Sequence, residues 1–190
     1  PKLFMSGSAI GIYGRQTTSN IDESFSEFNN EFTHEVCQHW EKIALSSTTD
    51  KTRVAILRTG VVLSNKGGAL SKMLLPFKLG VGGKIGNGEQ AMSWIHIDDM
   101  VSAILHIQHN ESLSGAINLT APTPVSNDEF SIALAKQLNR PCIFTTPAWL
   151  LRLIFGEMSD ILLFGQHVIP LKLSESGYVF KYASIKDAFE

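Results

Sequence analysis

The chain has 190 residues, of which 44% are hydrophobic, and its 16 basic and 18 acidic side chains give a formal net charge of −2. This length and composition suffice for one globular domain with a substantial core, or for a domain with a small lobe. The near-neutral charge and the absence of a basic run argue against a nucleic acid or an anionic membrane surface as partner. A small-molecule substrate is therefore the expected partner, and an oligomer is compatible with this composition.

Cysteine use and apolar runs exclude two further classes. Cys37 and Cys142 are the two cysteines, and they lack the spacing of a zinc site or a disulfide framework. We therefore expect free thiols, no metal site and a reducing, cytoplasmic location. No apolar run reaches 18 residues, which argues against a membrane helix.

The first apolar stretch, LFMSGSAIGIYG at residues 3–14, organises the rest of the prediction. Residues 3–5 are apolar without alternation, which predicts a strand buried on both faces, as in a parallel sheet covered by helices. We expect this strand to end in a turn at residues 6–8. Because ligands of such sheets bind beyond the carboxyl ends of strands, the stretch predicts a ligand-binding turn, with an ordinary polar loop as the alternative.

The next segments predict an alternation of helices and strands. Residues 15–30 are polar and predict a surface loop, whereas the apolar spacing across 30–46 predicts an amphipathic helix. Strands are expected at 53–57, 92–97 and 115–119, with helices capped by Asp98-Asp99 and by the capping box of Ser126 and Glu129. In the glycine-rich crossover at 65–88, the apolar segment 70–79 predicts a short helix or two. The GVGGKIGNG run predicts turns rather than a phosphate-binding loop, because it lacks P-loop spacing. This order predicts an α/β fold with a parallel sheet.

The composition shifts after residue 140. A helix with Pro147 near its first position, an apolar segment at 161–164, a short strand at 178–182 and a terminal helix are expected there. These elements predict a small mixed lobe.

Four strings carry a resemblance to a known family: SGSAIGIYG, the long run RTGVVLSNKGGALSKMLLPFKLGVGGKIGNGEQAMSWIHIDD, NLTAPTPVSNDEF, and GEMSDILLFGQHVIPLKLSESGYVFKY. On them, essentially the whole chain resembles atypical extended short-chain dehydrogenase/reductases, the NAD(P)-dependent epimerase-like "epimerase family proteins". The resemblance implies a Rossmann-type doubly wound parallel sheet with a small mixed α/β substrate lobe. It implies the carboxyl-terminal part of a dinucleotide-binding domain, with substrate-loop insertions, at 1–120 and the substrate lobe at 121–190.

The same resemblance implies NAD or NADP as cofactor, with NADP favoured. The family's main phosphate-binding motif, GxxGxxG after the first strand, has no counterpart in this sequence. Pro1 is therefore expected near the start of the family's fifth strand, in a fragment of a longer protein, and cofactor binding by this chain alone is expected to be weak or absent.

The resemblance also assigns site residues. Ser8 matches the catalytic serine, whose hydroxyl hydrogen-bonds the reacting substrate oxygen. The family's acid/base Tyr and the Lys four residues later are missing, because aligning Glu41 with the family's helix glutamate leaves Thr33 and Cys37 at those positions. The cofactor-binding residues would be Ser6, Gly7, Arg58, Thr59, Gly60, Val61 and Val62. The substrate-binding residues would be Tyr13, Lys72, Met92, Trp94 and His96, whereas Asp99 is expected to be structural.

These residues favour an NAD(P)-dependent epimerase or reductase for a small polar, sugar-nucleotide-like substrate. Met92 stands where sugar-nucleotide epimerases have an Arg on the substrate diphosphate, which counts against a nucleotide sugar. The missing Tyr-Lys pair leaves open whether the protein is an enzyme. The alternatives are a non-catalytic dinucleotide-binding sensor or regulator, with a cell-division role suggested by labels of similar proteins, and a hydrolase using Ser8. No GxSxG elbow supports the hydrolase.

Overall fold

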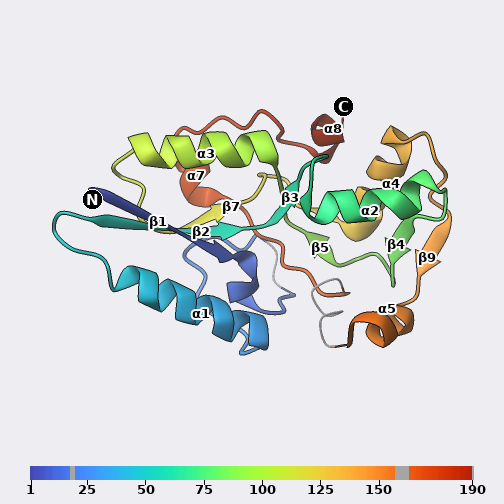
Figure 1. Cartoon of the computed structure of the whole chain (residues 1–190), viewed down its shortest axis with the longest axis horizontal. Helices are drawn as coiled ribbons and strands as arrows, with labels where there is room; N and C mark the ends of the chain where they lie inside the picture. The colour runs from blue at the N-terminus through green and yellow to red at the C-terminus, as the bar shows by residue number, and fades with distance from the viewer. Residues whose placement is uncertain (18–19, 157–162, 190) are drawn as a thin grey trace.

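A three-stranded parallel sheet of order β1-β2-β7 lies at the centre of the left half of the molecule in Figure 1. The computed structural model describes residues 1–17, 20–156 and 163–189. The strands are β1 (Leu3–Ala9), β2 (Arg53–Thr59) and β7 (Gly115–Leu119). β1 and β2 pair from Leu3↔Arg53 to Ala9↔Thr59, and β7 pairs with the second half of β2. The carboxyl ends of all three strands therefore meet at one edge.

Helices cover both faces of this sheet. Figure 1 shows α1 (Phe32–Leu45) below it and α3 (Ile97–His109) above it. The α3 face is apolar: Ala55, Leu57, Ile117 and Leu119 pack there with Ala103 and Ile107. The α1 face has a smaller apolar cluster of Ala44, Val54 and Ile56, and its remaining buried helix residues include His34 and Glu41. The predicted α/β class with a doubly wound parallel sheet is confirmed.

In the described part of the chain, the other strands form three two-stranded sheets. β3 (Val61–Leu63) pairs in parallel with β6 (Trp94–His96), β4 (Gly83–Ile85) in parallel with β9 (Phe144–Thr146), and β5 (Ala91–Met92) antiparallel with β8 (Val125–Ser126). Around them lie α2 (Gly68–Lys78), α4 (Asn127–Gln137) and α5 (Ala148–Phe155), and the tail adds α7 (Leu171–Glu175) and α8 (Ile185–Phe189). No described helix has both the length and the apolar composition needed to cross a membrane.

The strand β6 links the two main apolar cores. Its Ile95 packs in the core under α3, whereas its Trp94 packs with Phe77, Phe130 and Leu134 in the second core. Successive side chains of a strand point to opposite faces, so one short strand can serve both cores. The predicted division at residue 120 stays a prediction.

The first strand is longer than predicted. We expected it to end at residues 6–8, but these residues pair with Ile56, Leu57 and Arg58 of β2, and β1 continues to Ala9. The turn follows later, as the 3-10 helix η1 (Ile10–Tyr13). The prediction was wrong because pairing with a strand some 50 residues later overrides the local preference of Gly and Ser for turns.

The predicted surface loop at 15–30 is partly buried. Ile21 is fully enclosed, and its backbone pairs with the tail through hydrogen bonds from Ile21 N to His167 O (2.8 Å) and from Ile169 N to Ile21 O (2.9 Å). The crossover contains one helix, α2, with Pro76 inside it, and its glycine run includes β4. The expected strand at 92–97 is instead the end of β5 followed by β6.

Two predictions near α3 also need correction. Its N-cap is His96, whose Nδ1 accepts a hydrogen bond from Asp98 N, so Asp98 and Asp99 lie in the first turn rather than at the cap. No strand forms at 178–182, because the Asp99 carboxylate accepts the N–H groups of Lys181 and Tyr182 that a strand partner would otherwise satisfy. The capping box of Ser126 and Glu129 and the terminal helix are confirmed. Residues 161–162 of the predicted apolar segment lie outside the described residues.

Candidate functional site

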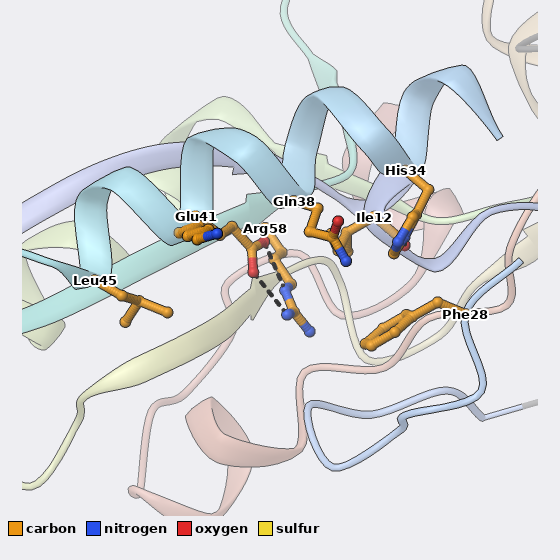
Figure 2. A pocket seen from close by; sticks show the side chains of 8 residues that line it. Ile12, Phe28, His34, Gln38, Glu41, Leu45 and Arg58 are labelled. Atoms are coloured by element: carbon orange, nitrogen blue, oxygen red, sulfur yellow. Dashed lines mark hydrogen bonds and ion pairs between the residues drawn. The ribbon is translucent and has the colours of Figure 1, made fainter. Parts of the chain in front are cut away.

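Ser8, Glu41 and Arg58 form a buried polar cluster between the sheet and α1. Register places Ser8 of β1 beside Arg58 of β2, so both side chains point to the α1 face. Ser8 Oγ donates to Glu41 Oε1 (2.8 Å), and Arg58 Nε and Nη2 donate to the two Glu41 oxygens at 2.9 and 2.8 Å. The guanidinium therefore binds the carboxylate bidentately, as the dashed lines in Figure 2 show.

Tyr13 extends this cluster across the sheet. Its hydroxyl accepts a hydrogen bond from Arg58 Nη1 (3.0 Å) and donates to Asn118 Oδ1 (2.9 Å). Asn118, in β7, pairs with Arg58 of β2, which in turn pairs with Ser8 of β1. The three residues therefore form one row across the sheet. Burial raises the pKa of Tyr13, although the Arg58 charge opposes the shift, so the phenol remains neutral and acts as a donor.

Arg58 keeps its charge in this enclosed place. Burial by itself would lower the pKa of the guanidinium, but the hydrogen bonds from Arg58 to Glu41, together with the charge of Glu41, raise it above the usual value. The pair is thus a buried, charge-neutral unit that joins β2 to α1.

The positions of the missing Tyr-Lys pair lie next to this cluster. Thr33 lies against η1, since a Cβ added to Gly11 would be 3.3 Å from Thr33 Cβ. Cys37 neighbours Ser8, and burial raises the pKa of its thiol despite hydrogen bonds with the Ala9 backbone and Ser8. Neither side chain can therefore serve as the charged partner that a Lys would provide near neutral pH.

Ser8 itself is 9% exposed and lies under α1 rather than in a turn beyond the strand. Its hydroxyl carries one proton, which it donates to Glu41. The serine therefore forms a hydrogen bond within the protein in this structure, and its catalytic role stays a prediction.

The residues predicted to bind the cofactor lie in several places. Ser6 and Gly7 line a pocket of about 380 Å³ between β1 and α1, together with Phe4, Trp40 and Ile43. A Cβ on Gly7 would meet nothing within 4 Å, so the backbone there is open.

The remaining cofactor predictions follow β2 into β3. Gly60 is tightly enclosed, because a Cβ there would lie 2.5 Å from Ser93 O. Thr59 is half-buried, as are Val61 and Val62 in β3. Arg58 lines a second pocket, which shares no lining residue with the pocket of Ser6 and Gly7. The structure does not gather all seven residues into one pocket.

The residues predicted to bind substrate are also spread out. Trp94 is fully buried in the second core, Met92 Sδ accepts a hydrogen bond from Asn127 Nδ2 (3.4 Å), and the His96 ring lies 3.9 Å from the Tyr182 ring. Tyr13 belongs to the Arg58 cluster. The side chain of Lys72, in α2, lies outside the described residues.

Several residues that sequence reasoning missed meet at the second pocket. Its volume is about 310 Å³, and its lining residues are Ile12, Phe28, His34, Gln38, Glu41, Lys42, Leu45 and Arg58. Gln38 and Leu45 have the helical spacing that places them on the same face as Glu41, the residue aligned with the family's helix glutamate, and this spacing was the available signal. Among the described residues, no group of three or more His, Cys, Asp or Glu could hold a metal ion.

Comparisons with known proteins identify the family. Residues 1–119 match the model of the NAD dependent epimerase/dehydratase family, and residues 146–190 match a domain of unknown function, DUF1731. An "epimerase family protein" of Staphylococcus aureus (strain N315) is 40% identical over all 190 residues. The chain spans 63% of that relative's length.

Solved structures agree with this assignment. The human epimerase family protein SDR39U1 (isoform 2), in a crystal structure with NADPH, is 33% identical with a TM-score of 0.94, over 100% of this chain and 64% of that one. A nucleoside-diphosphate sugar epimerase of Corynebacterium glutamicum is 32% identical with a TM-score of 0.80, over 98% of this chain and 36% of that one. The Rossmann-type fold and the resemblance inferred from sequence are confirmed, and the chain belongs to the NAD dependent epimerase/dehydratase family.

Proposed function

We propose that this chain forms the nicotinamide- and substrate-facing part of an NADPH-dependent protein that acts on a small polar substrate in the cytoplasm. The observation that carries the proposal is the TM-score of 0.94 over the whole chain to human SDR39U1, which was solved with NADPH. A dinucleotide of this kind supplies a hydride donor or acceptor. The nucleoside-diphosphate sugar epimerase neighbour favours a substrate with sugar-like hydroxyl groups.

The chain offers residues that fit the nicotinamide end of such a cofactor. Gly7 leaves open space at the backbone of β1, and the half-buried Thr59 ends β2 at the same edge of the sheet. In open α/β sheets ligands bind at the carboxyl ends of strands, where small residues allow close approach. Ser8, Glu41 and Arg58 would stiffen β1, β2 and α1 behind this edge.

A second candidate, a dinucleotide-binding sensor or regulator without turnover, is favoured by one observation. Thr33 and Cys37 stand where the family resemblance expects the acid/base Tyr and Lys, and the proton of Ser8 is donated to Glu41. Proton transfer to a substrate oxygen needs a group in hydrogen-bonding reach whose pKa suits the task. A buried thiol with a raised pKa is poorly suited to it.

One titration tests both candidates. NADPH is added to the protein that contains this chain, and fluorescence enhancement of the reduced cofactor is followed; the absence of saturable binding contradicts both. Transfer of deuterium from (4-²H)NADPH to sugar nucleotides or small hydroxyketones would then select the enzyme. Saturable binding with no transfer to any of these probes, in wild type and Ser8→Ala alike, would select the sensor.

A further inference from the structure

The 310 Å³ pocket in Figure 2 offers a binding site separate from the pocket of Ser6 and Gly7. The two pockets share no lining residue, and they lie against different faces of α1: Trp40 and Ile43 line one, whereas Gln38, Lys42 and Leu45 line the other. A ligand here would therefore contact the Arg58 side of the polar cluster. This inference does not depend on the proposed function.

Arg58 provides unused donors to this pocket. A guanidinium has five N–H groups, and three of those of Arg58 have acceptors among the described residues, namely two on Glu41 and one on Tyr13. One N–H on Nη1 and one on Nη2 remain, and each can donate a charge-assisted hydrogen bond to a carboxylate oxygen. In Figure 2 the guanidinium extends from Glu41 into the space between Leu45 and Phe28.

The charge of the lining favours an anion. Glu41 is the one acidic residue among the eight that line the pocket, whereas Arg58 and Lys42 are both basic. Glu41 is already held bidentately by Arg58, and Lys42 lies exposed at the rim. An incoming carboxylate would therefore meet an excess of one positive charge.

The walls are apolar and one of them is flat. The Phe28 ring stacks on the His34 ring with centroids 5.3 Å apart and planes at 30°. His34 is fixed by a hydrogen bond between its Nδ1 and Ile12 O. Phe28 and Leu45 remain 37% and 44% exposed, so a ligand can still cover apolar surface on both sides. The volume is at the lower end of the range for ligand pockets, roughly 300 to 1,000 Å³.

We propose that this pocket binds a small arylalkyl carboxylate. The carboxylate would accept the two remaining N–H groups of Arg58 and face Lys42, and the ring would lie between Phe28 and Leu45. The Ser8–Glu41–Arg58 cluster thereby connects the site to the carboxyl end of β1. A bound ligand would therefore alter the position of the strand that carries Ser6 and Gly7.

The test uses 3-phenylpropanoate and its neutral amide, titrated calorimetrically into the protein that contains this chain, without added dinucleotide. The acid should bind saturably with a Kd about tenfold below that of the amide, since a charge-assisted hydrogen bond contributes about 1.5–3 kcal/mol. Phe28→Ser should raise the Kd about tenfold by removing the flat wall. Lys42→Gln should raise it about threefold, as expected of an exposed charge.

Two controls keep the test decisive. Ile43→Ser, on the other face of α1, should leave the Kd unchanged, and Leu45→Ser serves as the wall variant if Phe28→Ser unfolds. Equal affinity for acid and amide, no saturable binding, or a loss caused by Ile43→Ser but by neither wall variant would overturn the proposal. A failure of NADPH binding in the separate titration would contradict the proposed function but not the carboxylate-binding pocket.

Discussion

Glu41 and Asp99 are both buried carboxylates, 7% and 1% exposed, but the protein satisfies them in different ways. Glu41 binds the Arg58 guanidinium and the Ser8 hydroxyl. Asp99 accepts the backbone N–H groups of Lys181 (2.9 Å) and Tyr182 (2.8 Å) and the Tyr178 hydroxyl (3.0 Å). Among the described residues, no cation bonds to Asp99, because the Lys181 ammonium lies 3.4 Å from Asp98 instead.

This difference separates two tasks. The Glu41 pair joins a helix to two strands through side chains that all come from the first 58 residues. Asp99 ties the tail at 178–182 to the first turn of α3 and replaces the strand partner that this segment lacks. Removing one partner of a buried ion pair leaves an unpaired charge and strongly destabilises the fold. A carboxylate that accepts backbone N–H groups instead mainly holds the local conformation of that backbone.

The largest effect is expected for Arg58→Met. It leaves the Glu41 carboxylate buried without its cation, which typically costs about 3–5 kcal/mol. The free energy of unfolding, measured by urea denaturation, should fall by that amount. The Tyr13 hydroxyl would lose its Arg58 donor as well.

The matched control is the double variant Glu41→Met, Arg58→Met. Removing both charges eliminates the unpaired carboxylate, so the double variant should be more stable than Arg58→Met alone. A double variant no better than the single one would show that the pair acts as packing volume rather than as matched charges.

Asp99→Asn should have a smaller effect, about 2 kcal/mol, because no charge is left unpaired. The amide has one oxygen, so some donors from Lys181, Tyr182 and Tyr178 lose their acceptor. Amide hydrogen exchange at Lys181 and Tyr182 should speed up more than exchange in β2. Uniformly faster exchange across the sheet would contradict a local role for this carboxylate.

The sequence predicted those features that depend on residues close together in the chain. The order of strand, helix and strand through residue 59 and the capping box of Ser126 and Glu129 were predictable, since period and caps are local signals. Asp99 was expected to be structural, but its partners lie some 80 residues away, and nothing local points to them.

The candidate site was less predictable for the same reason. The resemblance identified Glu41 as the helix glutamate, yet Arg58 was assigned to the cofactor, a role that stays a prediction. The register that places Ser8 beside Arg58 joins strands 50 residues apart in sequence, and that register also extended β1 past the expected turn. Long-range pairing, rather than propensity, fixes the chemistry of this cluster.

Ser8→Ala tests how far the Glu41 cluster depends on its weakest member. The change removes the hydrogen bond to a carboxylate that keeps both bonds from Arg58, and it removes the side-chain partner of the Cys37 thiol, so a loss of about 1 kcal/mol in unfolding free energy is expected. Ser6→Ala, on the same face but half-buried and outside the cluster, is the control and should be nearly neutral. A Ser8→Ala protein as stable as wild type would place the serine outside the structural role described above.

The last effect concerns the partner of Asp99, the Tyr178 phenol, and appears only at high pH. Burial, together with the nearby Asp99 charge, raises the pKa of Tyr178 to about 12 from a usual value of 10.0. Between these values the unfolded chain loses the phenolic proton while the folded chain keeps it, so stability falls as pH rises. Below pH 10.0 the contribution is fully present.

Urea midpoints at pH 9 and pH 11 measure this loss on either side of the usual tyrosine pKa, about 10. Tyr178→Phe should start less stable, because it forfeits the bond to Asp99, yet lose less between the two pH values than wild type. Tyr13, whose pKa is also raised by burial, contributes in both proteins and cancels in the difference. Equal losses in the two proteins would mean that Asp99 holds the tail through its backbone donors alone, and that the phenol is only a packing neighbour.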